Sequence, residues 1–177
     1  MSTKQMLLSG FGGQGILFAG KFLAYKGLTD GKQVSWLPSY GPEMRGGTAS
    51  CSVIISDEAV GSPIISNPDI LVAMNLPSLD KFEKSVASGG IILADSTLIE
   101  RKVERDDVTV FYVPATRLAS ENGFPTLANM ILMGKLLAVL GEFDADALNS
   151  TLAKVIPPKR AEMLETNLKA LKLGAEF

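Results

Sequence analysis

Short apolar runs alternate with helical segments along this chain, and that alternation limits its fold more than any other feature. The runs 70–74 and 91–94 are continuously apolar, which is typical of strands buried in a parallel sheet. The segment 16–28 is apolar nearly all round, as expected for a helix that lies beneath neighbouring elements. We expect strands at 5–9, 33–37, 70–74, 91–94 and 108–113, and helices at 16–28, 77–86, 115–121, 125–140, 144–155 and 159–173. This order predicts an α/β fold: a single three-layer, Rossmann-like domain over residues 1–177, with a mostly parallel sheet between helices.

One pair of strands is expected to run antiparallel. Segment 49–55 alternates and is rich in Val, Ile and Ser, and the turn at 56–58 would let 59–65 return beside it as a hairpin. The sheet should therefore be mixed. The Gly- and Pro-rich stretch 38–48 is expected to be a loop.

Charge and composition exclude several classes of function. With 19 acidic and 17 basic residues the net charge is −2, so the chain has no excess of basic residues for nucleic acid. It has no His and one Cys, which excludes a Ser-His-Asp triad, a His metal site, an internal disulfide and a four-thiolate cluster held by this chain alone. No apolar run approaches the roughly 20 residues of a membrane span, and the N-terminal segment is too short for a signal peptide. We therefore expect a cytoplasmic protein with no metal, no membrane association and a free Cys51.

A glycine-rich motif follows the first expected strand and opens the first expected helix. Its G-x-G-x-x-G spacing is formed by Gly10, Phe11, Gly12, Gly13, Gln14 and Gly15. Glycines permit a tight turn, and the free amides at the start of a helix attract anions. A dinucleotide site should have a carboxylate at the end of the second strand, but Asp30 precedes that strand and Leu37 ends it. The loop therefore favours contact with an anion or a backbone over a dinucleotide, and a tight turn without a ligand stays open.

The second unusual segment lies at 38–48 and joins two expected strands. It combines a Tyr hydroxyl, a carboxylate, a guanidinium and several glycine amides, and its fixed Gly and Pro residues give it a defined shape. The candidate contact residues are Ser39, Tyr40, Gly41, Pro42, Glu43, Met44, Arg45, Gly46 and Gly47. Arg45 can clamp a phosphate or carboxylate with two hydrogen bonds. The alternative is that Glu43 and Arg45 form a solvated surface pair.

These two loops carry a resemblance to a known family. The residues at 12–15 and 38–48, in this order and spacing, resemble the gamma subunit of the 2-oxoacid:ferredoxin oxidoreductases, the pyruvate/ketoisovalerate oxidoreductase gamma-domain family. The similarity continues through 55–57, 62–63, 68–69, 75–82, 89–90, 114–115 and Asn129, and so covers essentially the whole chain. The wording Tyr-Gly-Pro-Glu-Met-Arg-Gly-Gly-Thr is most similar to the 2-oxoglutarate type. Pyruvate-type gamma subunits more often have Phe and a second Arg in this loop, and indolepyruvate-type beta chains lack the Tyr-Gly-Pro element.

The resemblance implies a multi-subunit enzyme that converts 2-oxoglutarate, CoA and oxidised ferredoxin to succinyl-CoA, CO2 and reduced ferredoxin. It places thiamine diphosphate and Mg²⁺ between alpha and beta chains, and iron–sulfur clusters on beta or on a ferredoxin-like delta subunit. For this chain it implies no catalytic residue, a structural and loop-donating role near the active site, and no activity in isolation. A homodimer of the isolated chain stays possible.

Three other readings remain open beside this one. The alternatives are a 2-oxoisovalerate or pyruvate-type gamma subunit, a free-standing dinucleotide-binding oxidoreductase or sensor, and a purely structural assembly module. Individual residues have simpler expectations. Cys51 should be a small buried hydrophobe, Asp95 should cap a loop, and Asn129 should hold a helix to a loop as a satisfied polar group. Met130 and Met133 should pack in the core.

Overall fold

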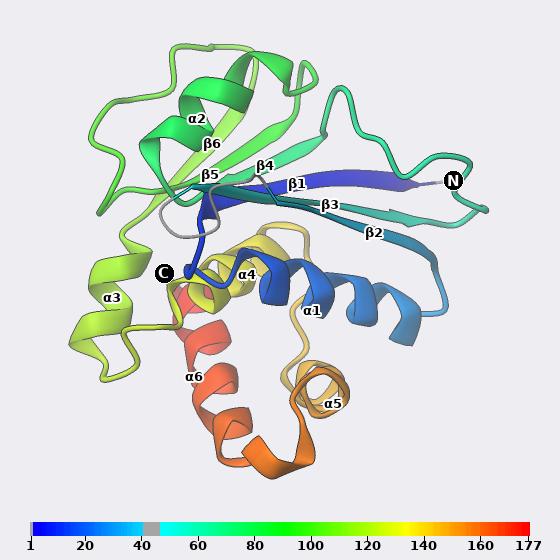
Figure 1. Cartoon of the computed structure of the whole chain (residues 1–177), viewed down its shortest axis with the longest axis vertical. Coiled ribbons are helices and arrows are strands. Elements are labelled where there is room, and N and C mark those ends of the chain that lie inside the picture. Colours follow the sequence, from blue (N-terminus) through cyan, green and yellow to red (C-terminus); the bar gives the residue numbers. More distant parts are fainter. Residues whose placement is uncertain (1, 41–46) are drawn as a thin grey trace.

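A six-stranded sheet forms the middle of the molecule in the computed structural model, which describes residues 2–40 and 47–177 (Figure 1). The strands are β1 (Thr3–Phe11), β2 (Gln33–Tyr40), β3 (Thr48–Ser56), β4 (Ile70–Ala73), β5 (Ile91–Asp95) and β6 (Thr109–Val113). Their order across the sheet is β2-β3-β1-β4-β5-β6. β1, β4, β5 and β6 run parallel, whereas β3 is antiparallel to both of its neighbours, β1 and β2. The prediction of a mixed, mostly parallel sheet is confirmed.

The position of the hairpin was predicted wrongly. The antiparallel partner of β3 is β2, whose Tyr40 pairs with Ala49, and residues 59–65 form no strand. Gly61, Pro63 and Pro68 interrupt the 57–69 stretch, and a proline cannot donate to a strand ladder. The expected loop at 38–48 is shorter at both ends, because β2 continues through Pro38 to Tyr40 and β3 already begins at Thr48. An edge strand tolerates proline, since one side of it has no neighbouring strand.

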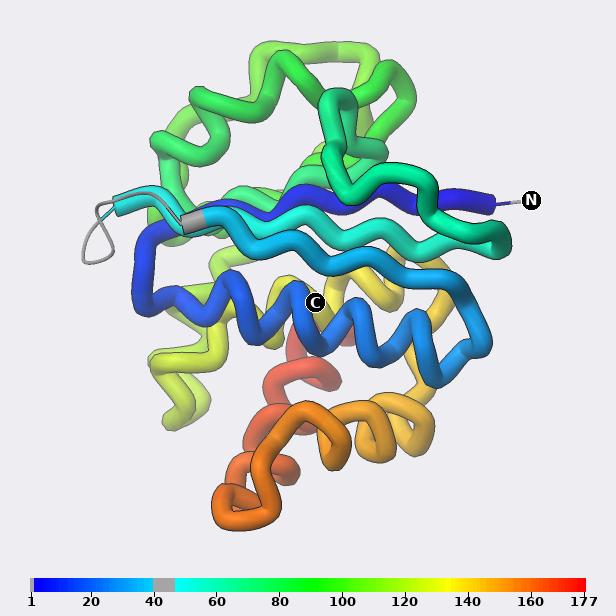
Figure 2. Tube along the Cα trace, turned by 45° about the vertical axis from the view of Figure 1, so that its right-hand side comes forward, coloured from blue at the N-terminus to red at the C-terminus, as the bar shows by residue number. Residues whose placement is uncertain are grey.

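Helices cover the two faces of the sheet unequally. On one side lie α1 (Ile16–Thr29), α3 (Ala115–Glu121), α4 (Ala128–Val139), α5 (Ala145–Val155) and α6 (Glu162–Glu176). On the other side lies α2 (Leu76–Phe82), followed by a 3-10 turn at Glu83–Ser85. Figures 1 and 2 show this arrangement, with α5 and α6 forming an outer layer beyond α1 and α4. The predicted three layers, with the sheet between α2 and the α1 and α4 layer, are therefore present, and α5 and α6 add to the helical mass on the α1 side.

Each face of the sheet has its own apolar core, because alternate residues of a strand point to opposite faces. Met6 and Leu8 of β1 belong to the larger core under α1 and α4, whereas Leu7 belongs to the smaller core under α2. Met130 and Met133 of α4 are fully buried in the larger core, which confirms their predicted packing role. Within the described ranges, every helix is too short or too polar to cross a lipid bilayer.

Candidate functional site

The glycine loop lies where the chain changes direction across the sheet. After β1 the chain passes through residues 12–15 into α1 and then to β2 on one side, whereas β4 lies on the other side of β1. In open α/β sheets the crevice outside the carboxyl ends of strands at such a point is the usual ligand site. The Gly12 amide donates to the Gly47 carbonyl at 3.0 Å. The structure therefore joins the glycine loop to the described end of the second predicted loop.

Two residues of the loop require glycine for conformational reasons. Gly13 has a φ of 94° and Gly15 a φ of 74°, both in the left-handed region. Gly15 also approaches α4, because the Asn129 side-chain amide donates to the Gly15 carbonyl at 3.0 Å. A Cβ on Gly15 would overlap that amide. Asn129 therefore holds α4 to the glycine loop, as predicted.

Gln14 fixes the loop from within. Its Oε1 accepts from the Phe11 amide at 2.6 Å, and its Nε2 donates to the Met74 carbonyl at the end of β4 at 3.2 Å. A Cβ on Gly10 would lie 2.6 Å from Gln14 Oε1. The Gln14 side chain therefore links the end of β1 to the end of β4 by hydrogen bonds. The glycine spacing did not reveal this role.

Three backbone amides of the loop are hydrogen-bonded within the protein. Phe11 N bonds to Gln14, Gly12 N to Gly47, and Gln14 N to the Phe11 carbonyl at 3.2 Å. A phosphate cradle needs such amides free to point at the ligand. The amides of Phe11, Gly12 and Gln14 are therefore not available to cradle an anion.

A buried polar cluster lies beside Gln14 and was not predicted. Asn75 caps α2, with its Oδ1 accepting from the Ser78 amide at 2.8 Å, and Ser9 Oγ donates to Ser78 Oγ at 2.8 Å. A signal was available in the sequence, because Asn followed by Leu-Pro is a helix start with Pro in the first turn. Within the described residues, Asn75 Nδ2 and Asn129 Oδ1 have no hydrogen-bond partner. The side chain of Asn129 was expected to be fully hydrogen-bonded, but among the described residues only its Nδ2 has a partner.

Asp95 is a structural cap, as predicted. The carboxylate at the end of β5 is fully buried and accepts from Thr97 N at 3.0 Å and from Thr116 Oγ1 at 2.5 Å. These bonds join the loop after β5 to the start of α3. With both oxygens in use, Asp95 is a structural carboxylate.

Cys51 is the small buried hydrophobe that was predicted. It is 1% exposed, and burial raises the pKa of its thiol to about 12. A thiol with such a pKa is not a nucleophile near neutral pH. Across residues 2–40 and 47–177, no three His, Cys, Asp or Glu residues are grouped to hold a metal ion.

The remaining predicted contact residues divide into two groups. Ser39 lies on β2 and Gly47 precedes β3, and the Tyr40 backbone closes the β2–β3 ladder opposite Ala49. The predictions for the Tyr40 side chain and for Gly41, Pro42, Glu43, Met44, Arg45 and Gly46 lie outside the described residues.

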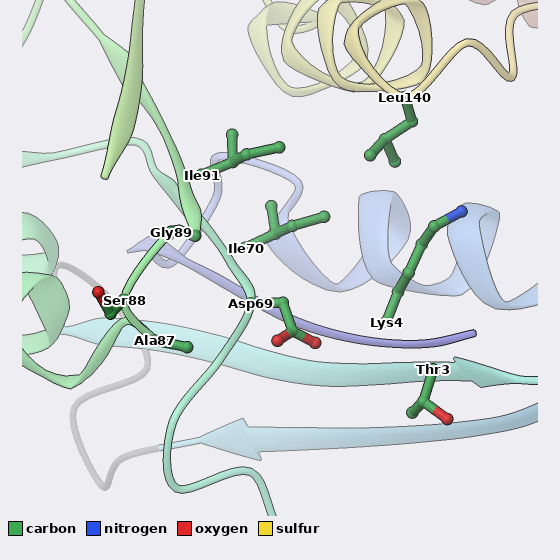
Figure 3. Close-up of a pocket in the computed structure, with 10 residues that line it drawn as sticks. Thr3, Lys4, Asp69, Ile70, Ala87, Ser88, Gly89, Ile91 and Leu140 are labelled. Carbon is green, nitrogen blue, oxygen red and sulfur yellow. The ribbon is translucent and has the colours of Figure 1, made fainter. Parts of the chain in front are cut away.

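A cavity of 220 Å³ lies at the opposite edge of the sheet (Figure 3). It is lined at the amino ends of the parallel strands by Lys4, Asp69 and Ile91, among others. Asp69 Oδ2 accepts from the Gln5 amide at 2.8 Å, and Lys4 is paired with Glu142. The Asp69 carboxylate and the Lys4 ammonium are therefore both paired within the protein, and the cavity lies at the far end of β1 from the glycine loop.

Comparisons with known proteins give a consistent result. The family described as pyruvate ferredoxin/flavodoxin oxidoreductase matches residues 5–177. The chain is 42% identical over 171 residues to ketoisovalerate oxidoreductase subunit VorA of Methanothermobacter thermautotrophicus, covering 96% of this chain and 35% of that relative. It is 38% identical to 2-oxoglutarate synthase subunit KorC of Methanocaldococcus jannaschii, covering 98% of this chain and 92% of the relative.

Solved structures share the fold. The keto/oxoacid ferredoxin oxidoreductase gamma subunit of Geobacter sulfurreducens has a TM-score of 0.82 and 30% identity, with 98% of this chain and 96% of that chain covered. The 2-oxoglutarate:ferredoxin oxidoreductase of Magnetococcus marinus has a TM-score of 0.88 at 23% identity, covering 99% of this chain and 31% of that one. The chain thus spans about a third of VorA and of the Magnetococcus polypeptide, and nearly all of KorC and of the Geobacter subunit.

Proposed function

Since the chain belongs to the pyruvate ferredoxin/flavodoxin oxidoreductase family, we propose that it is the gamma subunit of a 2-oxoacid:ferredoxin oxidoreductase. The observation that carries the proposal is the match over nearly its whole length to KorC, a relative of similar size. The proposed reaction joins CoA to the acyl group of a 2-oxo acid, releases CO2 and passes the electron pair to ferredoxin.

The proposed substrate is 2-oxoglutarate. KorC supports this choice, because 92% of its length is matched, and the Tyr-Gly-Pro-Glu-Met-Arg wording of the second loop agrees with it. Ketoisovalerate is the second candidate, favoured by the 42% identity to VorA. Pyruvate is less supported, since identity to pyruvate synthase subunit PorC of Methanothermobacter marburgensis is 26%.

We assign this chain a structural role in the reaction. The residues of the chain do not fit an iron–sulfur cluster, because its one thiol is the buried Cys51. The loops at 10–15, 75–78 and 96–99 hold no charged side chain to move a proton. Thiamine diphosphate, Mg²⁺ and the clusters are therefore proposed for alpha, beta and ferredoxin-like delta chains, and the complex for the cytoplasm.

Reconstitution tests the function. The tagged chain, co-expressed anaerobically with its companion subunits, should purify with them and reduce ferredoxin on addition of 2-oxoglutarate and CoA, whereas the isolated chain should not. A matched assay with 2-oxoisovalerate separates the two substrate candidates. Purification without any thiamine- or cluster-binding chain, or turnover by the isolated chain, would contradict the proposal.

Arg45 remains the proposed anion contact on sequence grounds. Arg45→Ala should lower turnover or raise the KM for CoA, because it removes a guanidinium group, which can bind an anion through two hydrogen bonds. Arg45→Lys keeps the positive charge but lacks the planar guanidinium group, and should therefore recover part of the lost activity. Unchanged kinetics in Arg45→Ala would remove the residue from the site.

A further inference from the structure

Three large apolar side chains are exposed at the carboxyl edge of the parallel strands. Phe11 at the end of β1 is 38% exposed, Leu76 after β4 is 38% exposed, and Leu98 after β5 is 41% exposed. An exposed apolar side chain is ordinary by itself, but several at one edge indicate an interaction surface.

The strand register places these residues near one another. Ser9 pairs with Ala73 and Ala73 with Ala94, so Phe11, Asn75 and Ser96 stand at the same level on neighbouring strands. Neighbouring strands are roughly 4.8 Å apart. Phe11, Leu76 and Leu98, with the loops 10–15, 75–78 and 96–99, form what we call the carboxyl-edge surface. It lies at the end of β1 away from the N-terminus in Figure 1.

The chemistry of this surface is that of a protein interface. A fifth of the chain is charged, yet the three loops contain no Asp, Glu, Lys or Arg. Depletion of charge and exposure of an aromatic side chain are the compositional marks of an interface core. The loop amides of Phe11, Gly12 and Gln14 are already bonded within the chain and are not available to hydrogen-bond a partner.

The free edge of the sheet at β2 is less suited to a partner. Trp36 and Leu37 are partly exposed there, but Pro38 follows them in the same strand and has no amide to donate. Proline on an edge strand is a known means of blocking strand addition. The carboxyl-edge surface is therefore the stronger candidate.

We propose that the carboxyl-edge surface docks the companion polypeptide that corresponds to the remainder of VorA. This inference rests on the proposed function. In VorA and in the Magnetococcus oxidoreductase, the part matched by this chain is about a third of a longer polypeptide, so the rest of that polypeptide is the natural neighbour. The partner should present an uncharged, apolar patch that receives Phe11, Leu76 and Leu98.

Binding measurements with arginine variants test the proposal. Leu76→Arg and Leu98→Arg should each weaken binding of the purified companion by about tenfold or more, because the interface core would have to desolvate a charge. Leu28→Arg and Ile64→Arg are matched controls, since these leucine and isoleucine side chains are 56% and 71% exposed away from this edge. The controls should bind like the wild type. Phe11→Ser is a second test that introduces no charge and should also weaken binding.

The outcomes separate the two proposals. Urea unfolding of each variant first establishes that it folds. If the wild type does not bind the companion at all, the proposed function fails. If the wild type binds and Leu76→Arg, Leu98→Arg and Phe11→Ser bind equally well, the docking surface is wrong while the function stands. Equal weakening by Leu28→Arg would also overturn the docking surface.

Discussion

Gly13 and Gly15 show how one residue type can meet two different requirements in the same loop. Both have positive φ, but only Gly15 lies against Asn129. Gly13→Ala should therefore reduce the free energy of unfolding by about 1 kcal/mol, the cost of a left-handed alanine. Gly15→Ala should cost about 3 kcal/mol, because it also displaces the Asn129 amide from its hydrogen bond. Urea unfolding of both variants measures the difference, and equal losses would refute the role given to Asn129.

Asp57 provides a pH-dependent contribution to stability. Hydrogen bonds from the Lys32 ammonium and the Ser2 amide lower the pKa of Asp57 from 3.8 to about 2. A carboxyl with a lowered folded-state pKa stabilises above its unfolded pKa and loses that stabilisation as the pH falls toward the folded value. The pair is exposed to solvent, so the effect should be small and screened by salt.

The expected signature is a difference between two proteins. The free energy of unfolding of the wild type should exceed that of Asp57→Asn at neutral pH, and the excess should decline as the pH falls below about 4. Urea unfolding across this range measures it, with Glu58→Gln as a neighbouring carboxyl control. An excess that grew on acidification would contradict the assignment.

At the scale of elements, α4 and α6 pack closely at two glycines. A Cβ on Gly134 would overlap the Leu171 carbonyl, and a Cβ on Gly174 would overlap the Ile131 carbonyl. The two helices can approach this closely only because each offers a glycine to the backbone of the other. Gly134→Ala and Gly174→Ala should each lower the free energy of unfolding by about 3 kcal/mol, because the helices must separate.

Gly61→Ala is the matched control for this prediction. Nothing lies within 4 Å of the added Cβ, and Gly61 has no positive φ, so the change should be within about 0.5 kcal/mol. Thermal or urea unfolding compares the three variants. Wild-type stability in Gly134→Ala would show that the helices can shift without loss.

The hairpin illustrates where element prediction failed. Alternation of apolar and polar residues correctly located β3, but the choice between 33–37 and 59–65 as its partner depends on contacts distant in sequence. β3 pairs with β1 on its other side, so that β1 holds antiparallel β3 and parallel β4 at once. Strand periodicity carries no information on such neighbours, and Pro63 was the local sign against a strand at 59–65.

At the scale of the whole molecule, two cores share one sheet. Leu7 and Leu71 face the smaller core, whereas Leu8 and Val72 face the larger one. Both cores therefore depend on the same strands, and unfolding of one core would disrupt the other. We therefore propose that residues 1–177 unfold as a single cooperative domain. Fluorescence of Trp36, the sole tryptophan, which lies over Gly20 of α1, should show the same urea midpoint as far-ultraviolet circular dichroism. Two separate midpoints would divide the chain into independent units.

The sequence by itself determined the order of elements, the buried strands, the structural roles of Cys51 and Asp95, and the resemblance carried by two loops. These follow from local pattern and residue chemistry, which act over a few neighbouring residues. Only the tertiary structure decided that Gln14 would span the β1 and β4 ends and that the amides of Phe11, Gly12 and Gln14 would be hydrogen-bonded within the chain. It also decided that Phe11, Leu76 and Leu98 would lie at the same edge of the sheet. Such features depend on strand order and register, which pair residues from 21 to 64 positions apart and leave no periodic trace in the chain.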